Sequence, residues 1–520
     1  MSRRRKILIV VGIVLGVAIL VPVIRHYQLR FAVANYVAEL KAKGEPMDLA
    51  QVIPPRVPAE ENSADILRKG DESFNEEFAA DKSLLETNFV YGMRMVAPGK
   101  AMVRWCQPDV RDIDGTNSWE NVTKAVGQNS KAFALLQQIV AKPNFDFHVD
   151  YSPGVADLNF TNFYLSQCKR ESQRLEAAVI NDLHQGDTDS AVKNLRAMLA
   201  LVKAMHDERL VISELVRIAM AQITLTANWE FLQSTNLTDE QLAELQQDWT
   251  SLDFIRGDEN AMAMERVTGR ITSAKWRKSN STLQDYIETW VNLGLSDQEE
   301  TPLDKLKVKT KVFLWRYWWS YPDELRALES YEIFLKAVRF AETNNSFQTA
   351  IANQRNELAA LKLNNTNDES DFFMNPAKAD IHFLLSQGVM SMSAVFDKVM
   401  RVETAKQMTI IAIALKRYQL KHGNYPADLN SLVPEFVPTI PFDPVDGQPL
   451  RYRPNADGTF LLYSVGENGV DDGGNPSLEK FVTGSNYSWQ NIHALDWVWP
   501  QPATEDEIQA YYKKLSAKSN

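Results

Sequence analysis

Residues 175–205 read LEAAVINDLHQGDTDSAVKNLRAMLALVKAM, and they set the expected class of fold. Apolar side chains recur every three or four residues before Gly186, and the same spacing resumes at Ala191. This spacing puts an apolar face on each of two helices. Gly186 can take the positive φ that ends one helix, and Asp187 or Asp189 can cap the next. The stretch therefore predicts a helical hairpin.

Helical spacing of the same kind dominates residues 121–390. A third helix is expected from about Val211 to Leu232. A fourth begins after Thr238, which stands three residues before Gln241, the spacing of a capping box. No repeat of fixed length recurs, so the sequence predicts an irregular array of helical hairpins and a mainly α fold.

An uncharged apolar stretch, ILIVVGIVLGVAILVPVI, occupies residues 7–24 behind the basic tip MSRRRK. As a helix it reaches roughly 27 Å, enough for the hydrocarbon core of a bilayer. The basic tip puts the N-terminus in the cytoplasm, although Arg25 and Arg30 weaken the charge bias. We predict a transmembrane helix within residues 1–30, through which the chain contacts the membrane.

Two interpretations of this apolar segment remain open, an uncleaved signal-anchor and a cleaved signal peptide. The small residues Ala32 and Ala34 fit a cleavage site, but they lie beyond the apolar stretch and past two arginines. This distance favours a signal-anchor, which predicts a single-pass protein of a bacterial inner membrane. Under both interpretations nearly all of the chain is periplasmic, outside the cytoplasm.

Residues 31–120 are expected to join the membrane segment to the helical array. They begin with a membrane-proximal helix that ends at Gly44, and an extended connector follows because Pro54, Pro55 and Pro58 disfavour helix. The later part of this region has no dominant pattern.

The chain has two cysteines, Cys106 and Cys168. In an oxidising compartment they could form one disulfide. The sequence contains no CxxC motif, which argues against a thioredoxin-like or zinc-ribbon site.

Six aromatic residues crowd the stretch FLWRYWWSY between Phe313 and Tyr321. One interpretation is a bulky helix face packed in the core. The alternatives are an aromatic belt at the membrane surface or a protein-binding patch.

A small α+β unit is expected at residues 391–500, before a tail at 501–520. An amphipathic helix should run from about Ser391 to Lys421, because apolar side chains form one stripe along it. The segments PLRYR and TFLLYSV then have the character of strands, and Asp457-Gly458 between them is a strong turn signal.

This C-terminal segment resembles the C-terminal domain of the type II secretion major pseudopilin. The likeness rests on a helix followed by an Asn-x-Tyr-Pro step, a short helix with paired leucines, a strand with prolines and a glycine loop, YSVGENGVDDGG. The matching residues are Asn424, Tyr425, Pro426, Leu429, Leu432, Asp443, Pro444, Gly447, Pro449, Tyr452, Tyr463, Ser464, Gly466 and Gly469. The resemblance covers about 100 residues, under a fifth of the chain.

The resemblance implies a structural calcium ion in the glycine loop. Calcium takes six to eight oxygen ligands, and glycines let backbone carbonyls turn toward it. The alternative is an ordinary exposed turn, which the same residue types favour. The positions that match the ligands of the family are Asn468, Asp471, Asp472 and Asp496, with carbonyl oxygens from Ser464 and Val465.

The chain also departs from the pseudopilin pattern. A pseudopilin joins its membrane helix directly to this domain and carries a Glu just inside the apolar stretch, whereas here the first Glu is Glu39. Several hundred residues separate the two segments. Filament assembly through the N-terminal helix is therefore not expected. We interpret the domain as a pseudopilin-like module within a different kind of protein.

No catalytic motif is present: the sequence lacks GxSxG, HExxH, a Walker loop and GxGxxG. His148 and His382 each stand two residues from an acid, Asp150 and Asp380, a pairing common by chance. The net charge of -11 argues against a nucleic-acid partner. We expect a membrane-anchored extracytoplasmic scaffold or interaction protein, not an enzyme. The alternatives are an adaptor of a type II secretion-like apparatus and an envelope hydrolase with a site assembled from distant helices.

Overall fold

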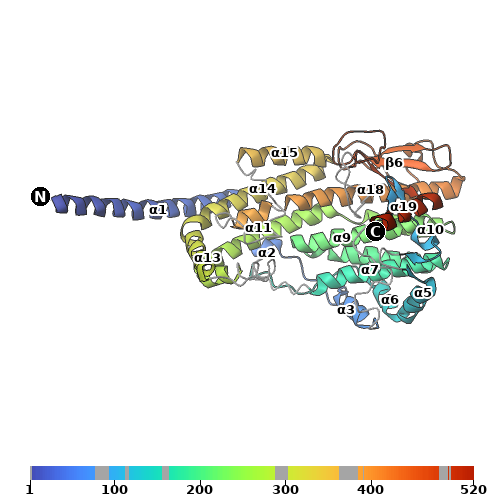
Figure 1. Cartoon of the computed structure of the whole chain (residues 1–520), viewed down its shortest axis with the longest axis horizontal. Coiled ribbons are helices and arrows are strands. Elements are labelled where there is room, and N and C mark those ends of the chain that lie inside the picture. The colour runs from blue at the N-terminus through green and yellow to red at the C-terminus, as the bar shows by residue number, and fades with distance from the viewer. Residues whose placement is uncertain are drawn as a thin grey trace.

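The computed structural model describes residues 3–75, 93–111, 116–154, 163–286, 302–361, 384–390, 392–478, 490 and 494–519. Helices dominate this part of the chain, which confirms the mainly α prediction (Figure 1). The helices are α1 (Arg3–Ala42), α2 (Leu49–Val52), α3 (Ala64–Glu72), α5 (Trp119–Gln128), α6 (Ser130–Gln137), α7 (Phe163–His184), α8 (Thr188–Ala204), α9 (Val211–Leu232), α10 (Asp239–Thr250), α11 (Phe254–Lys278), α13 (Pro302–Leu314), α14 (Ser320–Asn344), α15 (Phe347–Ala360), α17 (Leu384–Met390), α18 (Ser393–His422) and α19 (Glu505–Ser519).

The strands are short and lie in three small sheets. They are β1 (Met95–Ala97), β2 (Lys100–Ala101), β3 (Val110–Arg111), β4 (Thr116–Asn117), β5 (Arg451–Pro454), β6 (Phe460–Ser464), β7 (Trp497–Val498) and β8 (Gln501–Pro502). The sheets have the orders β1-β2-β8, β3-β4 and β5-β6-β7.

The predicted hairpin is formed by α7 and α8. Gly186 has φ 75° between them, and the Asp187 side chain accepts a hydrogen bond from the Ser190 amide at 2.9 Å. The capping box at the start of α10 is also present, since Thr238 and Gln241 exchange side-chain to backbone hydrogen bonds. The glycine and capping residues in the sequence therefore predicted these helix ends correctly.

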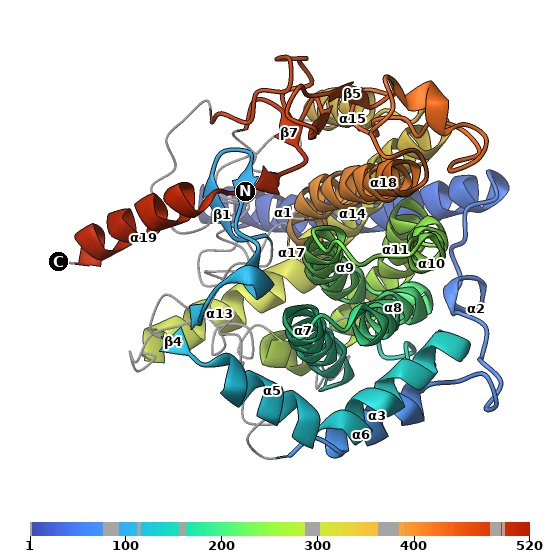
Figure 2. The same cartoon turned by 90° about the vertical axis from the view of Figure 1, so that its right-hand side faces the viewer.

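Helix α9 forms the centre of the array. It contacts α7, α8, α11 and α18, which surround it in the end-on view of Figure 2. A helix in this position is buried on nearly all sides, as Trp229, Phe231 and most other residues of α9 are. Its buried charged residues, such as Arg217 and Glu214, are paired with each other.

The C-terminal unit shares its hydrophobic core with the helical array. One cluster of buried residues includes Leu195 of α8, Trp229 of α9 and Ile411 of α18. The Trp229 indole also donates to the Pro500 carbonyl at 2.9 Å, and Gln246 donates to the Phe436 carbonyl at 2.6 Å. The unit therefore packs as a continuation of the array.

The predicted β-hairpin is confirmed by β5 and β6. They are antiparallel, with Arg451 opposite Tyr463 and Pro454 opposite Phe460, and Gly458 takes φ 82° in the turn. Residues 501–520, expected as a tail, instead carry β8 and α19, and β8 pairs in parallel with β2.

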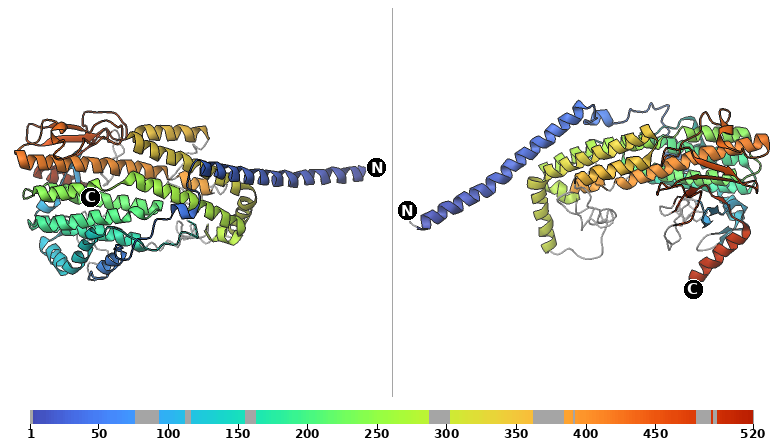
Figure 3. Two further views of the ribbon diagram at one scale, coloured as in Figure 1. Left: turned by 180° about the vertical axis from the view of Figure 1, so that it is seen from behind. Right: turned by 90° about the horizontal axis from the view of Figure 1, so that it is seen from above.

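Helix α1 is one continuous helix of 40 residues, where the sequence suggested a membrane segment followed by a separate helix. Its N-terminal part projects from the body, and Figures 1 and 3 show this from three sides. We call residues 3–32 the stalk. The side chains of residues 7–19, most of the predicted spanning stretch, lie outside the described residues. Within the part that is described, none of the helices combines the length and apolar character needed to cross a membrane.

The base of the stalk is clamped to the body. Val33, Val37 and Leu40 pack with Leu328 of α14. Just beyond the helix, Glu45 accepts from Arg266 Nη2 at 2.7 Å and from Arg339 Nη1 at 2.6 Å. Burial raises the pKa of Glu45, but the hydrogen bonds from the two arginines outweigh it and leave the pKa below its usual value. A charged, doubly paired carboxylate thus holds the end of α1 against α11 and α14.

The two cysteines, which could have formed a disulfide, are unpaired. Cys106 is a free, exposed thiol, and Cys168 is buried with its Sγ 3.6 Å from the Met205 Sδ. Desolvation raises the pKa of the Cys168 thiol well above its usual value. Cys168 therefore acts as a small apolar core residue.

Candidate functional site

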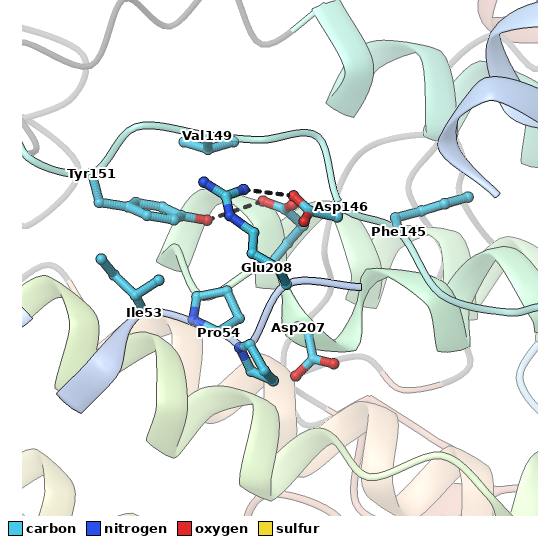
Figure 4. Close-up of a pocket in the computed structure, with 10 residues that line it drawn as sticks. Ile53, Pro54, Phe145, Asp146, Val149, Tyr151, Asp207 and Glu208 are labelled. Atoms are coloured by element: carbon cyan, nitrogen blue, oxygen red, sulfur yellow. Dashed lines mark hydrogen bonds and ion pairs between the residues drawn. The ribbon is translucent and has the colours of Figure 1, made fainter. Parts of the chain in front are cut away.

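A small pocket lies where the proline-rich connector passes the turn after α8 (Figure 4). Successive prolines keep the connector extended, so its backbone can run beside another extended segment at residues 145–151. The pocket has a cavity volume of about 20 Å³, room for about one water molecule. It is lined by Ile53, Pro54, Pro55, Arg56, Phe145, Asp146, Val149, Tyr151, Asp207 and Glu208.

Glu208 is the carboxyl group of this pocket whose pKa is raised. Its side chain is buried, and Oε2 accepts hydrogen bonds from the hydroxyls of Tyr151 at 3.4 Å and Tyr164 at 3.3 Å. Burial raises the pKa of Glu208 to about 7. Both protonation states are therefore populated near neutral pH, a property that general acid–base groups need.

Asp146, whose carboxylate lies beside that of Glu208 in Figure 4, has the opposite pKa shift. Arg56 Nη1 donates to its Oδ1 at 2.9 Å, and the His148 amide donates to the same atom at 2.7 Å. Burial raises the pKa of Asp146, but the hydrogen bonds from His148 and Arg56 are stronger and lower it overall. The pKa values of the two carboxyl groups of this pocket are thus shifted in opposite directions.

Sequence reasoning missed most of this pocket. It singled out His148 and Asp150, but His148 contacts Asp146, and Asp150 instead accepts from the Ser152 amide at 2.9 Å. Glu208 and its tyrosines are 44 and 57 residues apart in the chain. No local pattern marks such a contact.

We expect Glu208→Gln to remove part of the pH dependence of stability. The native pKa of Glu208 is raised above its unfolded value, so its favourable contribution is complete below about pH 4.5 and is lost as the pH rises through about 7. The difference is about 3 kcal/mol. Urea unfolding of the full chain in detergent at pH 5 and pH 7.5 measures it. Glu61→Gln, an exposed glutamate of the connector, is the control. Equal pH dependence in both variants would contradict the assignment.

The predicted calcium ligands lie in or beside the glycine loop, and the side chains of Asn468, Asp471 and Asp472 form hydrogen bonds within the protein. Asp471 accepts from the Tyr463 hydroxyl at 3.0 Å, and Asn468 donates to Asp472 at 3.0 Å. The Ser464 hydroxyl is buried and donates to Asp443 at 2.8 Å, and Val465 donates its amide to the same carboxylate at 3.1 Å.

Asp496 closes the loop directly. It accepts from the amides of Gly474 and Asn475, each at 2.9 Å, and of Asp472 at 3.4 Å. Asp496 therefore lies at the glycine loop, although about twenty residues separate the two in sequence. In the part of the chain that the structure describes, no three His, Cys, Asp or Glu side chains are grouped to hold a metal ion. The residues as they lie do not fit a calcium shell, and the calcium ion stays a prediction.

Chelation tests that prediction. Because amide groups already satisfy Asp496, we expect the Tm of the full chain to be the same in calcium and in chelator. Bound calcium would instead stabilise the folded state in proportion to the logarithm of its concentration. A Tm that climbs steadily with calcium and falls on chelation would show that the loop rearranges to bind the ion.

No family model, curated protein or solved structure matches the chain.

Proposed function

We propose that this protein is a membrane-anchored extracytoplasmic scaffold of a bacterial inner membrane. The stalk inserts in the bilayer through residues 7–24, and the body holds the pseudopilin-like C-terminal unit on the periplasmic side. The observation that carries the proposal is the exposure of large apolar side chains along the described part of the stalk. These are Leu20, Val21, Val23, Ile24, Tyr27 and Phe31.

Exposed apolar surface of this extent needs a partner. Soluble proteins rarely expose contiguous apolar patches beyond a few hundred Å², and here the exposed side chains continue directly from the apolar stretch of the sequence. A bilayer covers such a helix on all sides, which a single protein groove does not. The basic residues before the stretch favour an N-terminus in the cytoplasm.

The body has the form of a spacer. Helix α18 has 30 residues, roughly 45 Å, and leads to the C-terminal sheet at the end of the body opposite the stalk (Figure 1). The Glu45 clamp and the shared core leave few places for the parts to move relative to each other. The C-terminal unit is thereby presented at a set distance from the bilayer, as a scaffold requires.

Arginines in the apolar stretch test the anchor. We expect Val14→Arg/Val17→Arg to move most of the protein from the membrane fraction to the soluble fraction, because each arginine costs about 2.5–3.5 kcal/mol at the centre of a spanning helix. Carbonate extraction of membranes measures the distribution. Leu420→Arg, at an exposed position of α18, is the control. Carbonate-resistant retention of the double variant would refute the anchor.

A further inference from the structure

The end of the body that faces the stalk carries a second surface. Helix α13 and the π-helical turn η5 (Trp315–Trp319) lie at the end from which α1 projects, in every view of Figures 1 and 3. The His26 Nδ1 donates to the Tyr317 carbonyl at 2.9 Å, and its ring meets the Tyr321 ring edge-on at 5.0 Å. The stalk and η5 are therefore in direct contact.

This contact fixes the height of η5 along the stalk. The apolar stretch ends at Ile24, and His26 is two residues further on. At 1.5 Å per residue, the contact lies about 3 Å beyond the end of the apolar stretch. In a bilayer that holds residues 7–24, η5 is then level with the lipid headgroups.

The exposed side chains of α13 and η5 are of the kinds that favour a bilayer interface. Trp315 faces inward, where its indole donates to Asp323 at 2.9 Å, and Val312 is also buried. The outward residues combine aromatic and aliphatic groups with lysine. We call them the interfacial face: Leu306, Lys309, Lys311, Phe313, Tyr317 and Trp318, all exposed.

The exposure of these aromatic rings is large. Phe313 is 49%, Tyr317 44% and Trp318 46% exposed. Tryptophan and tyrosine prefer the headgroup level, where the ring is covered and its polar atom stays wet. Lysine near an anionic bilayer contributes about fivefold to binding. The core interpretation of the aromatic stretch applies to the inward side of the helix, and the exposed rings on the outward side fit the interpretation as a membrane-surface belt.

We infer that the interfacial face lies on the same bilayer that the stalk enters and binds anionic lipid headgroups. This inference rests on the proposed membrane anchor. The stalk and the face together make a two-point attachment: the stalk sets the depth, and the face sets the tilt of the body. Arg25 and Arg30, exposed on the stalk beside this level, add positive charge.

The test uses the full chain in nanodiscs of phosphatidylcholine, with or without phosphatidylglycerol. Bromine near the lipid headgroup quenches a tryptophan at that depth, and the difference between the wild type and Trp318→Phe isolates the signal of Trp318. We expect this signal to be quenched, at least about twofold more strongly with the anionic lipid. The acidic residues Asp297, Glu299 and Glu300 precede α13 in the sequence and oppose binding to anionic lipid. The effect of lipid charge is therefore the most discriminating part of the test.

A matched pair of variants separates charge at this face from charge in general. Lys309→Ala/Lys311→Ala should lower the quenching of Trp318 in the anionic nanodisc. Lys124→Ala/Lys131→Ala removes the same charge from exposed positions on α5 and α6 and should leave quenching unchanged.

The outcomes distinguish the two proposals. A chain that fails to enter the nanodisc overturns the anchor and this inference together. A chain that inserts with Trp318 unquenched overturns the inference and leaves the anchor standing. Equal quenching in neutral and anionic lipid overturns the headgroup assignment. Trp318 shielded in proportion to protein density would show that a second copy covers the face instead.

Discussion

Arg217→Met lowers the free energy of unfolding by about 3–5 kcal/mol, the largest single effect we expect. The Arg217 side chain is only 1% exposed. Its Nη1 donates to Glu214 at 3.0 Å, its Nε to the Val202 carbonyl at 3.0 Å and its Nη2 to the Asp253 carbonyl at 3.1 Å. Methionine fills part of the volume but leaves a buried carboxylate and two carbonyl groups without these donors.

The surroundings of Arg217 offer no replacement. Burial already raises the pKa of Glu214 despite the arginine, and the nearby Asp258 has a pKa raised well above its usual value by burial and by Glu214. Gly257 also packs so closely that an added Cβ would lie 2.6 Å from Arg217 Nη1. The core of the variant therefore cannot easily rearrange to satisfy the groups that lose their hydrogen bonds to Arg217.

Urea unfolding of the full chain in detergent measures this effect. Arg256→Met is the control, since Arg256 is 52% exposed and pairs with Glu259 at the surface, where such pairs contribute about 0–1 kcal/mol. Adding Glu214→Leu to Arg217→Met should recover much of the loss, because it removes the unpaired charge. A loss below that of the control would refute the argument.

Asp443→Ala has the second largest expected effect and acts on the C-terminal unit. The buried carboxylate accepts from Arg451 Nη1 at 2.9 Å, Ser464 Oγ at 2.8 Å, and the amides of Val445 and Val465, each at 3.1 Å. Burial raises the pKa of Asp443 to about 6. Alanine leaves three donors without their acceptor, and Arg451 Nη1 with Asp446 Oδ1 alone at 3.2 Å, which costs about 2–4 kcal/mol.

Amide hydrogen exchange locates this second effect. We expect protection to fall across β5 and β6, while α7 to α9 keep theirs. The control Asp506→Ala alters an exposed aspartate of α19, where surface changes stay near 0.5 kcal/mol. Uniform loss over the whole chain would show that the unit has no local stability of its own.

Local chemistry explains what the sequence predicted well. The hairpin at Gly186, the capping box at Thr238 and the turn at Asp457 each depend on residues a few positions apart. The proximity of Asp496 to the glycine loop came from the family resemblance, because about twenty residues intervene.

Long-range pairing explains what the sequence did not predict. Glu45 meets arginines 221 and 294 residues away, and β2 pairs with β8 across most of the chain. The pocket around Glu208 is of the same kind. Each partner alone is an ordinary surface-type residue, and only the packed array brings them together.

Helix α1 is unbroken from Val23 to Ala42, and the Glu45 clamp follows three residues later, so the stalk and the body are joined without a flexible tether. Neighbouring copies in one bilayer would then stand at equal height and with the same end outward. A binding partner of the C-terminal unit would then find identical sites at one height above the bilayer. The density of copies in the membrane plane, and not the distance of the sites from the membrane, would limit how many copies bind at once.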